Sequence, residues 1–209
     1  MPAPDFSSKL IRRHLAGDPV LKAIIQRHGP CTLTPVPTPP YRALCTAVVF
    51  QQLHAKAART ILGRVCALGK SKYFPSPDKL DQLSDAQLRG AGLSAAKTAA
   101  VRDIAAKTRD KTIPSSRAIM NMPDDEIIER CTEARGVGRW TVEMMLMFRL
   151  GRPDVLPVDD YGVRNGFRIA FQMKDMPTTK ELAAYGERWK PWRTVAAWYM
   201  WRVADASKA

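Results

Sequence analysis

Two glycines one residue apart, Gly136 and Gly138, stand directly before an apolar helix-forming run, and they constrain the fold of this chain most. Glycine has no Cβ, so the backbone can turn tightly and the amides at the start of the new helix can point outward together. Such a helix start favours an anion, and Arg139 adds a positive charge beside it. The same pattern is also typical of an ordinary corner between two helices, because short glycine motifs are weak signals by themselves.

Two adjacent carboxylates, Asp159 and Asp160, follow the apolar run and precede a helical segment that begins at Tyr161. Capping of that helix explains one acid. The second is a carboxylate near a helix start, where the helix dipole favours negative charge. Because an acid close to a phosphate-binding turn is unhelpful for affinity, the pair indicates chemistry.

Three separated blocks together resemble one known family. They are Gly136–Thr141, Leu156–Tyr161 and Glu187–Arg193, and they occur in the family's order within a resemblance that covers about Tyr41 to Asp205. The family is the helix-hairpin-helix DNA glycosylases of the DNA-3-methyladenine glycosylase II type. The resemblance implies a monofunctional glycosylase that flips alkylated purines of the 3-methyladenine and 7-methylguanine type out of damaged double-stranded DNA. It would excise them by hydrolysing the N-glycosidic bond in base excision repair.

A non-catalytic helix-hairpin-helix module for DNA binding or damage recognition is the alternative function. Such a module would share the positive charge and the glycine turn. It would have no need for the paired acids Asp159 and Asp160 together with the distant tryptophans. Excision of an alkylated base by the purified protein separates the two hypotheses.

The resemblance implies Asp160 as the catalytic acid, because the family's aspartate matches the second acid of the pair. The Pro-Val-Asp phrase of other relatives would instead align Asp159, which we keep as the alternative and as the expected cap or neighbour. Trp201 matches the tryptophan of the base pocket, and Tyr161 is a weaker candidate. An aromatic pocket suits the substrate, since a cationic purine is attracted to an electron-rich ring. For most other aromatic residues of the C-terminal segment we expect plain core packing.

Contacts to the DNA backbone are also implied by the resemblance, although Lys97 is equally well explained as part of a solvated basic face. The expected backbone-contacting residues are Gly136, Val137, Gly138, Arg139, Thr141 and Lys97. By the same alignment Gln52 fills the gap left by the extruded nucleotide, with Leu53 adjacent. Trp140 stands where bifunctional relatives carry a lysine nucleophile, so we expect no cleavage of the DNA strand.

The charge balance supports a polyanionic partner, since 33 basic residues face 20 acidic ones for a net charge of +13. We expect no membrane association, no obligate protein partner and a cytoplasmic location, because the chain has no long apolar run and no apolar secretory segment. The four cysteines are scattered, which predicts buried free thiols and no metal site. We expect no cofactor, with a monovalent cation at the hairpin left open.

An all-α fold is predicted, because apolar residues recur at helical spacing and no alternating strand pattern is present. We expect a single helical glycosylase unit, residues 1–209, made of two lobes and without an N-terminal β-domain. About 41–120 would form one lobe, and 1–40 with 121–209 would form the lobe that carries the hairpin. The proline-rich stretch 29–40 is the best candidate for a boundary. Asp18 as cap, Pro19 at the first position and Gly29 as stop predict a helix over 19–28, and Ser94 begins another over 95–107.

Overall fold

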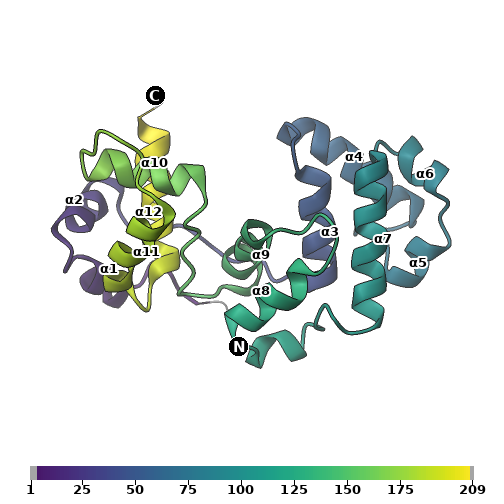
Figure 1. Cartoon of the computed structure of the whole chain (residues 1–209), viewed down its shortest axis with the longest axis horizontal. Coiled ribbons are helices and arrows are strands. Elements are labelled where there is room, and N and C mark those ends of the chain that lie inside the picture. The colour runs from purple at the N-terminus through teal and green to yellow at the C-terminus, as the bar shows by residue number, and fades with distance from the viewer. Residues whose placement is uncertain (1–3, 208–209) are drawn as a thin grey trace. The chain divides into compact units, whose positions relative to one another are not determined.

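A computed structural model describes residues 4–207, and every regular element in that range is a helix, so the predicted all-α class is confirmed (Figure 1). The α-helices are α1 (Lys9–Leu15), α2 (Pro19–His28), α3 (Pro40–Phe50), α4 (Ala55–Leu68), α5 (Pro77–Asp81), α6 (Asp85–Gly90), α7 (Ala95–Arg109), α8 (Asp124–Thr132), α9 (Arg139–Met145), α10 (Tyr161–Ala170), α11 (Thr179–Gly186) and α12 (Arg193–Ala206). Two short 3-10 helices, η1 (Ala118–Asn121) and η3 (Glu187–Trp189), and a π-helical segment, η2 (Leu146–Leu150), complete the chain.

Capping residues explain where several helices begin and end. The Asp18 carboxylate accepts hydrogen bonds from the first backbone N–H groups of α2, and Pro19 occupies the first helical position. Gly29 ends that helix with a positive φ of 72°. The Ser94 hydroxyl accepts from the Lys97 N–H and starts α7 in the same way. All of these boundaries were predicted from the sequence.

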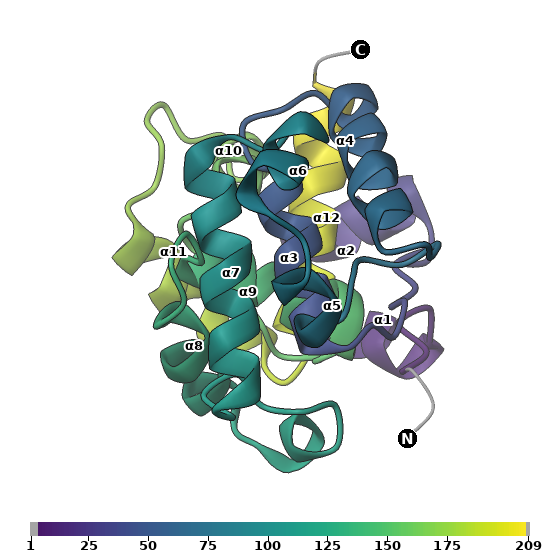
Figure 2. The same cartoon turned by 90° about the vertical axis from the view of Figure 1, so that its right-hand side faces the viewer.

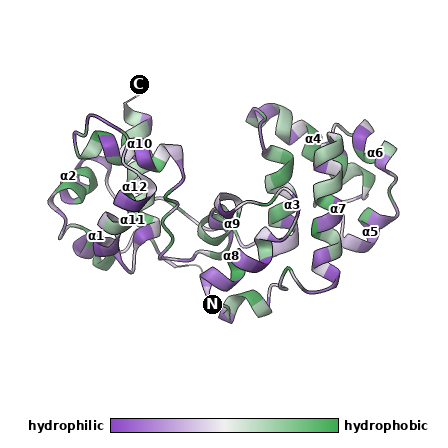
Figure 3. Ribbon diagram, in the orientation of Figure 1, coloured by the Kyte–Doolittle hydropathy of each residue, from purple (hydrophilic) through white to green (hydrophobic). Residues whose placement is uncertain are grey.

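The chain divides into two compact units, of which unit 2 spans Thr38–Met145 and contains α3 to α9. Helix α3 is central in this unit and packs against α4, α7 and α9. Figure 2 shows α3 beside α7, and Figure 3 shows that much of α3 is hydrophobic. The core of unit 2 consists of aliphatic side chains with at most 1% exposure, including Leu44, Val48, Val101, Ile104, Ile127 and Val142.

Unit 1 combines the chain up to Pro37 with the chain from Leu146 onward. Helix α10 packs along α12, and α2 also packs against α12. A Cβ at Gly166 of α10 would overlap the backbone carbonyl of Met200 on α12, so glycine is what permits this close approach. The core of unit 1 is more aromatic than that of unit 2 and includes Leu21, Val163, Phe167, Trp189 and Tyr199.

The division differs from the predicted one in where the hairpin lies. We expected the hairpin in a lobe with residues 1–40, but the structure groups α8 and α9 with α3 and α7, and the boundary falls after Met145. The reason is tertiary packing: Ile127 of α8 and Val142 of α9 are fully buried, and α9 packs against α3. The other boundary, between Pro37 and Thr38, lies inside the predicted proline-rich stretch. Among residues 4–207, no helix has the length and apolar character needed to cross a membrane.

Candidate active site and nucleic-acid interface

The Asp160 carboxylate lies at the start of α10 and is held by two donors. Its Oδ1 accepts a hydrogen bond from the Val163 N–H at 2.8 Å, and another from the indole Nε1–H of Trp201 at 2.8 Å. The predicted catalytic acid and the predicted base-pocket tryptophan, 41 residues apart in sequence, are therefore in direct contact. Asp160 is the N-cap of α10, and Asp159, which we expected as the cap or its neighbour, is the exposed residue directly before it.

Glycine at position 162 makes room for the contact between Asp160 and Trp201. A Cβ at Gly162 would lie 2.8 Å from Cδ1 of Trp201 and 3.1 Å from Oδ1 of Asp160. Gly162 and Gly166 are four residues apart and so share the face of α10 that meets α12. The two glycines thus bring α12 close enough for the Trp201 indole to reach the carboxylate.

Phe148 is an aromatic neighbour of this pair that sequence reasoning missed. Its ring stacks on Trp201, with centroids 5.7 Å apart and an interplanar angle of 26°. It belongs to η2, and π-helical turns often occur at functional sites. The one available signal was an aromatic residue inside the apolar run between the hairpin and the acids. Tyr161, the other predicted pocket residue, begins α10 directly after Asp160 and is 69% exposed.

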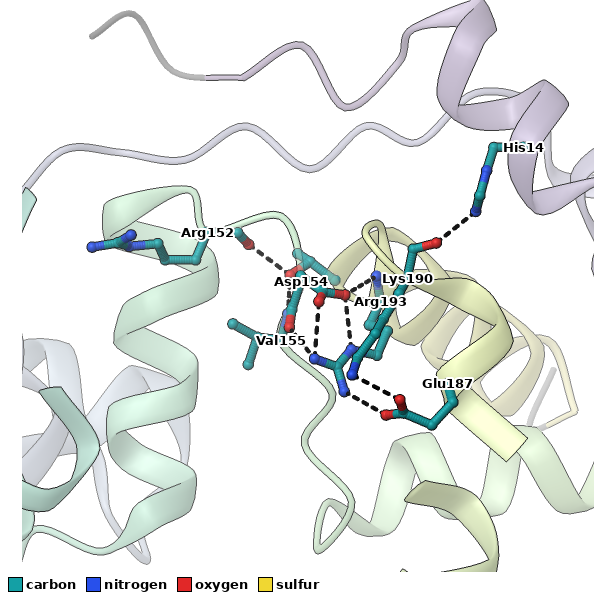
Figure 4. A network of polar contacts seen from close by, with 8 residues as sticks. His14, Arg152, Asp154, Val155, Glu187, Lys190 and Arg193 are labelled. Atoms are coloured by element: carbon teal, nitrogen blue, oxygen red, sulfur yellow. Dashed lines mark hydrogen bonds and ion pairs between the residues drawn. The ribbon is translucent and has the colours of Figure 1, made fainter. Parts of the chain in front are cut away.

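The loop that leads to the two acids is fastened to the start of α12 (Figure 4). Arg193 donates from Nε to Oδ1 of Asp154 at 2.7 Å and from Nη2 to Oδ2 at 2.9 Å, a bidentate geometry. The Thr194 hydroxyl donates to the Arg152 carbonyl at 2.6 Å and accepts from the Val155 N–H at 3.0 Å. These bonds fix the direction in which the chain approaches Asp159 and Asp160.

Glu187 extends this network on the side of η3 (Figure 4). Its carboxylate pairs with Arg193 at 3.3 Å and with Lys190 at 2.7 Å, and the Lys190 carbonyl lies 2.7 Å from Nε2 of His14. The third block of the family resemblance, Glu187–Arg193, therefore supports the acid-bearing loop. Three aromatic residues of the C-terminal segment are core residues as expected, since Trp189, Trp198 and Tyr199 are at most 8% exposed.

The predicted hairpin lies in unit 2, between α8 and α9. Gly136 has a φ of +76°, which only glycine adopts readily, and a Cβ there would lie 3.2 Å from the Cβ of Ala100 on α7. The Arg135 N–H donates to Oδ2 of Asp103 on α7 at 2.7 Å. Gly138, with open space around its Cα, directly precedes the first residue of α9. The turn predicted from the two glycines is present and is anchored on α7.

Two of the predicted backbone-contacting side chains face the interior. Val137 and Thr141 are each 5% exposed. Their N–H groups donate inside the turn, from Val137 to the Ala134 carbonyl at 3.0 Å and from Thr141 to the Gly138 carbonyl at 2.9 Å. Burial makes these two side chains anchors of the turn, and the contact of the two residues with the DNA backbone stays a prediction.

Arg139 is an exposed cation of the hairpin and is already paired within unit 2. Its Nε donates to Oε1 of Glu143 at 3.0 Å, and its Nη2 lies 3.9 Å from Oδ1 of Asp125. Glu143 is only 2% exposed, so Arg139 offsets a buried carboxylate while more than half of its own side chain stays accessible. Trp140, at the position of the lysine in bifunctional relatives, is 47% exposed.

Lys97 has contacts other than the predicted one. Its ammonium donates to the carbonyls of Val49 and Gln51, both at 2.8 Å, at the C-terminal end of α3. Burial lowers the pKa of Lys97 from its usual value. Both of these hydrogen bonds serve the loop that follows α3, and the phosphate contact of Lys97 stays a prediction. That loop contains the predicted gap-filling residues Gln52 and Leu53, both of which are exposed.

All four cysteines are free and buried, as predicted. Burial raises the pKa of the Cys31 and Cys131 thiols to about 11, so they are protonated at neutral pH and poor nucleophiles.

Comparison with known proteins identifies the family. The model of the HhH-GPD superfamily of base excision DNA repair proteins matches residues 45–191. DNA-3-methyladenine glycosylase 1 of Schizosaccharomyces pombe is 39% identical over 172 residues, which cover 81% of this chain and 75% of the relative.

Solved structures agree with the sequence match. The 3-methyladenine DNA glycosylase Mag1 of Schizosaccharomyces pombe, in complex with abasic DNA, superposes with a TM-score of 0.82 at 35% identity over 96% of this chain and 98% of that one. A DNA-3-methyladenine glycosidase from Bacillus halodurans superposes with a TM-score of 0.88 at 32% identity over 100% of this chain and 94% of that one. This chain belongs to the HhH-GPD superfamily of base excision DNA repair proteins.

Proposed function

We propose that this protein is a monofunctional DNA glycosylase that excises alkylated purines from duplex DNA. The observation that carries the proposal is the hydrogen bond of 2.8 Å between the indole of Trp201 and the carboxylate of Asp160. A carboxylate and an aromatic ring in contact are the two groups that removal of a cationic base requires. Relatives over most of this chain's length are named DNA-3-methyladenine glycosylases, which supports the catalytic function over a purely DNA-binding one.

The proposed reaction begins when the damaged nucleotide rotates out of the stack, because the glycosidic carbon is inaccessible in stacked duplex. Alkylation at a ring nitrogen leaves the purine cationic and makes it a good leaving group. When the bond between C1′ and the base nitrogen breaks, the electron pair stays on the base, which leaves neutral. Positive charge grows on the sugar, and the Asp160 carboxylate stabilises it.

Water completes the reaction as the nucleophile. Its oxygen bonds to C1′, and its proton passes to solvent, with Asp160 orienting the water molecule. The product is an intact strand with an abasic site and a free base. This proposed hydrolysis uses a carboxylate and water and needs no cofactor. Trp201, which Phe148 supports by stacking, and the exposed Tyr161 would contact the cationic base.

Binding of the duplex is proposed to involve a second set of residues, on unit 2. The exposed hairpin residues Gly138 and Arg139 would contact phosphate, which positions the protein without reading the base. Gln52, with Leu53 beside it, would fill the gap in the stack. We propose that the protein acts on chromosomal DNA in the cytoplasm and, in a bacterium, at the nucleoid.

The test of this function is release of the base by purified protein. A duplex that carries one 7-methylguanine or 3-methyladenine is incubated with excess enzyme, and the free base and the alkali-labile abasic site are quantified. We expect both products in equal amounts, with no strand break before alkali treatment. Binding of the damaged duplex without any base release would instead identify a non-catalytic recognition protein.

A further inference from the structure

The loop between α3 and α4, residues Gln51 to His54, contains an unfavourable backbone conformation at Gln52. Gln52 has a φ of +55°, in the left-handed region that residues with a Cβ rarely adopt. The side chain of Gln52 is exposed, and so is the apolar side chain of Leu53 at 39%. A conformation of this kind persists only when surrounding groups hold it in place.

Lys97 on α7 is the first group that holds this loop. Its ammonium donates to the Val49 and Gln51 carbonyls, both at 2.8 Å. Carbonyls in the last turn of a helix have no partner within the helix, and the helix dipole makes this end negative. A lysine from a different helix therefore closes the end of α3 directly before Gln52. The N-cap Ser94 fixes the position of Lys97 in the first turn of α7.

Gln51 supplies the second connection, to the hairpin. Its side-chain Nε2 donates to the Gly136 carbonyl at 2.9 Å. Gly136 itself lies against Ala100 of α7, and the neighbouring Arg135 N–H is bonded to Asp103 of the same helix. The loop and the hairpin, about 85 residues apart in sequence, are thus fastened to each other and to α7 within unit 2.

We infer that Lys97 and Gln51 are positioning residues that hold the gap-filling loop in register with the phosphate-binding hairpin. The inference rests on the proposed function, in which Gln52 and Leu53 enter the stack while the hairpin contacts the backbone. A loop that is already ordered loses less conformational freedom when it enters DNA, so binding energy is available to open the stack. Lys97 then acts through the loop and makes no phosphate contact of its own.

The first measurement distinguishes these two roles of Lys97 by the salt dependence of binding to undamaged duplex. The slope of log K against log salt concentration is negative, and each lost phosphate contact reduces its magnitude by about 0.9. Lys97→Met keeps the length and the apolar stem but removes all donors, and we expect its slope to equal that of the wild type. Arg139→Met is the comparison, with an expected decrease of about 0.9.

The second measurement reports entry of the loop into the stack and does not depend on catalysis. A duplex carries 2-aminopurine next to a stable abasic analogue, and its fluorescence rises when a side chain separates the stacked bases. The wild type and Lys97→Arg, which keeps donors for the two carbonyls, should give the full rise. Lys97→Met and Gln51→Leu should lose most of it at saturating protein, and circular dichroism checks that each variant is folded.

Two results would overturn the inference. One is a slope for Lys97→Met whose magnitude is smaller by about 0.9 while the fluorescence rise is intact, which would make Lys97 a phosphate contact. The other is a full rise for both Lys97→Met and Gln51→Leu, which would show that the loop needs neither residue. Failure of the proposed function is seen separately, as absence of base release by the wild type.

Discussion

The Asp160 carboxylate combines two roles that need different things from one side chain. As the N-cap of α10 it accepts from the Val163 N–H, and as the proposed catalytic acid it accepts from the indole of Trp201. Both bonds are to Oδ1, so the orientation of the whole carboxylate is fixed before substrate arrives. Hydrogen bonds to an ionised acceptor are stronger than neutral ones, and a fixed charge stabilises a growing cation without reorganisation.

The Trp201 indole N–H can be separated from the Trp201 ring by substitution. Trp201→Phe keeps an aromatic face for the base and for stacking on Phe148 but removes the donor to Asp160. A hydrogen bond to a charged group contributes about 1.5–3 kcal/mol, so the single-turnover rate of excision should fall about 10- to 100-fold.

Affinity for undamaged duplex should stay near that of the wild type. A Trp201→Phe enzyme with the wild-type rate would show that the hydrogen bond has no part in the reaction.

Trp140 bears on whether the protein can cut the DNA strand. An indole cannot attack the sugar carbon as an amine, and the adjacent guanidinium of Arg139 stays protonated, so no Schiff base should form here. Incubation with damaged duplex and borohydride should yield no covalent protein–DNA adduct, while base release proceeds. Robust trapping would mean that a lysine elsewhere in the chain reaches the sugar.

At the level of the helices, the site depends on the close packing of α10 against α12. The pair Gly162 and Gly166 lets α12 approach, and the approach brings Trp201 to Asp160. A Cβ at position 166 would overlap the Met200 carbonyl, and backbone cannot move aside as a flexible side chain can. The two helices would have to separate.

Gly166→Ala should therefore destabilise the protein by about 3 kcal/mol, the upper end of the usual cost of overpacking. Gly63→Ala is the matched control, because Gly63 is an exposed residue inside α4 with open space around it. This control should be neutral or stabilising by about 0.5–1 kcal/mol. Urea unfolding of both variants tests the difference, and equal midpoints would refute the packing argument.

Prediction from sequence succeeded where the signal is local. Asp18, Pro19 and Gly29 bound α2 as expected, because a cap, a first-turn proline and a C-terminal glycine act within a few residues. It missed contacts between residues far apart in sequence. The hydrogen bonds of Lys97 reach carbonyls about 46–48 residues away, and the π-helical turn that carries Phe148 has no local signature.

For the whole molecule, composition and the family blocks predicted the class of partner, but they did not predict how the chain divides into two units. A net charge of +13 indicated a polyanionic partner, in agreement with membership of a DNA repair superfamily. The grouping of the hairpin with α3 and α7 was missed because it depends on which buried faces meet, and single-sequence periodicity shows only that a face is buried.

The proposed mechanism depends on Asp160, and not Asp159, being the catalytic acid. The most direct measurement is the single-turnover rate of base excision from a duplex with one alkylated purine, compared for the wild type, Asp160→Asn and Asp159→Asn. Asparagine keeps the size of the side chain and an oxygen that can cap α10, so the fold should be preserved.

We predict that Asp160→Asn abolishes excision but binds the damaged duplex at least as tightly as the wild type, because only transition-state stabilisation and a negative charge are lost. Asp159→Asn, at an exposed position, should retain most of the wild-type rate. Excision by Asp160→Asn at the wild-type rate, together with its loss in Asp159→Asn, would show that Asp159 and not Asp160 is the catalytic acid.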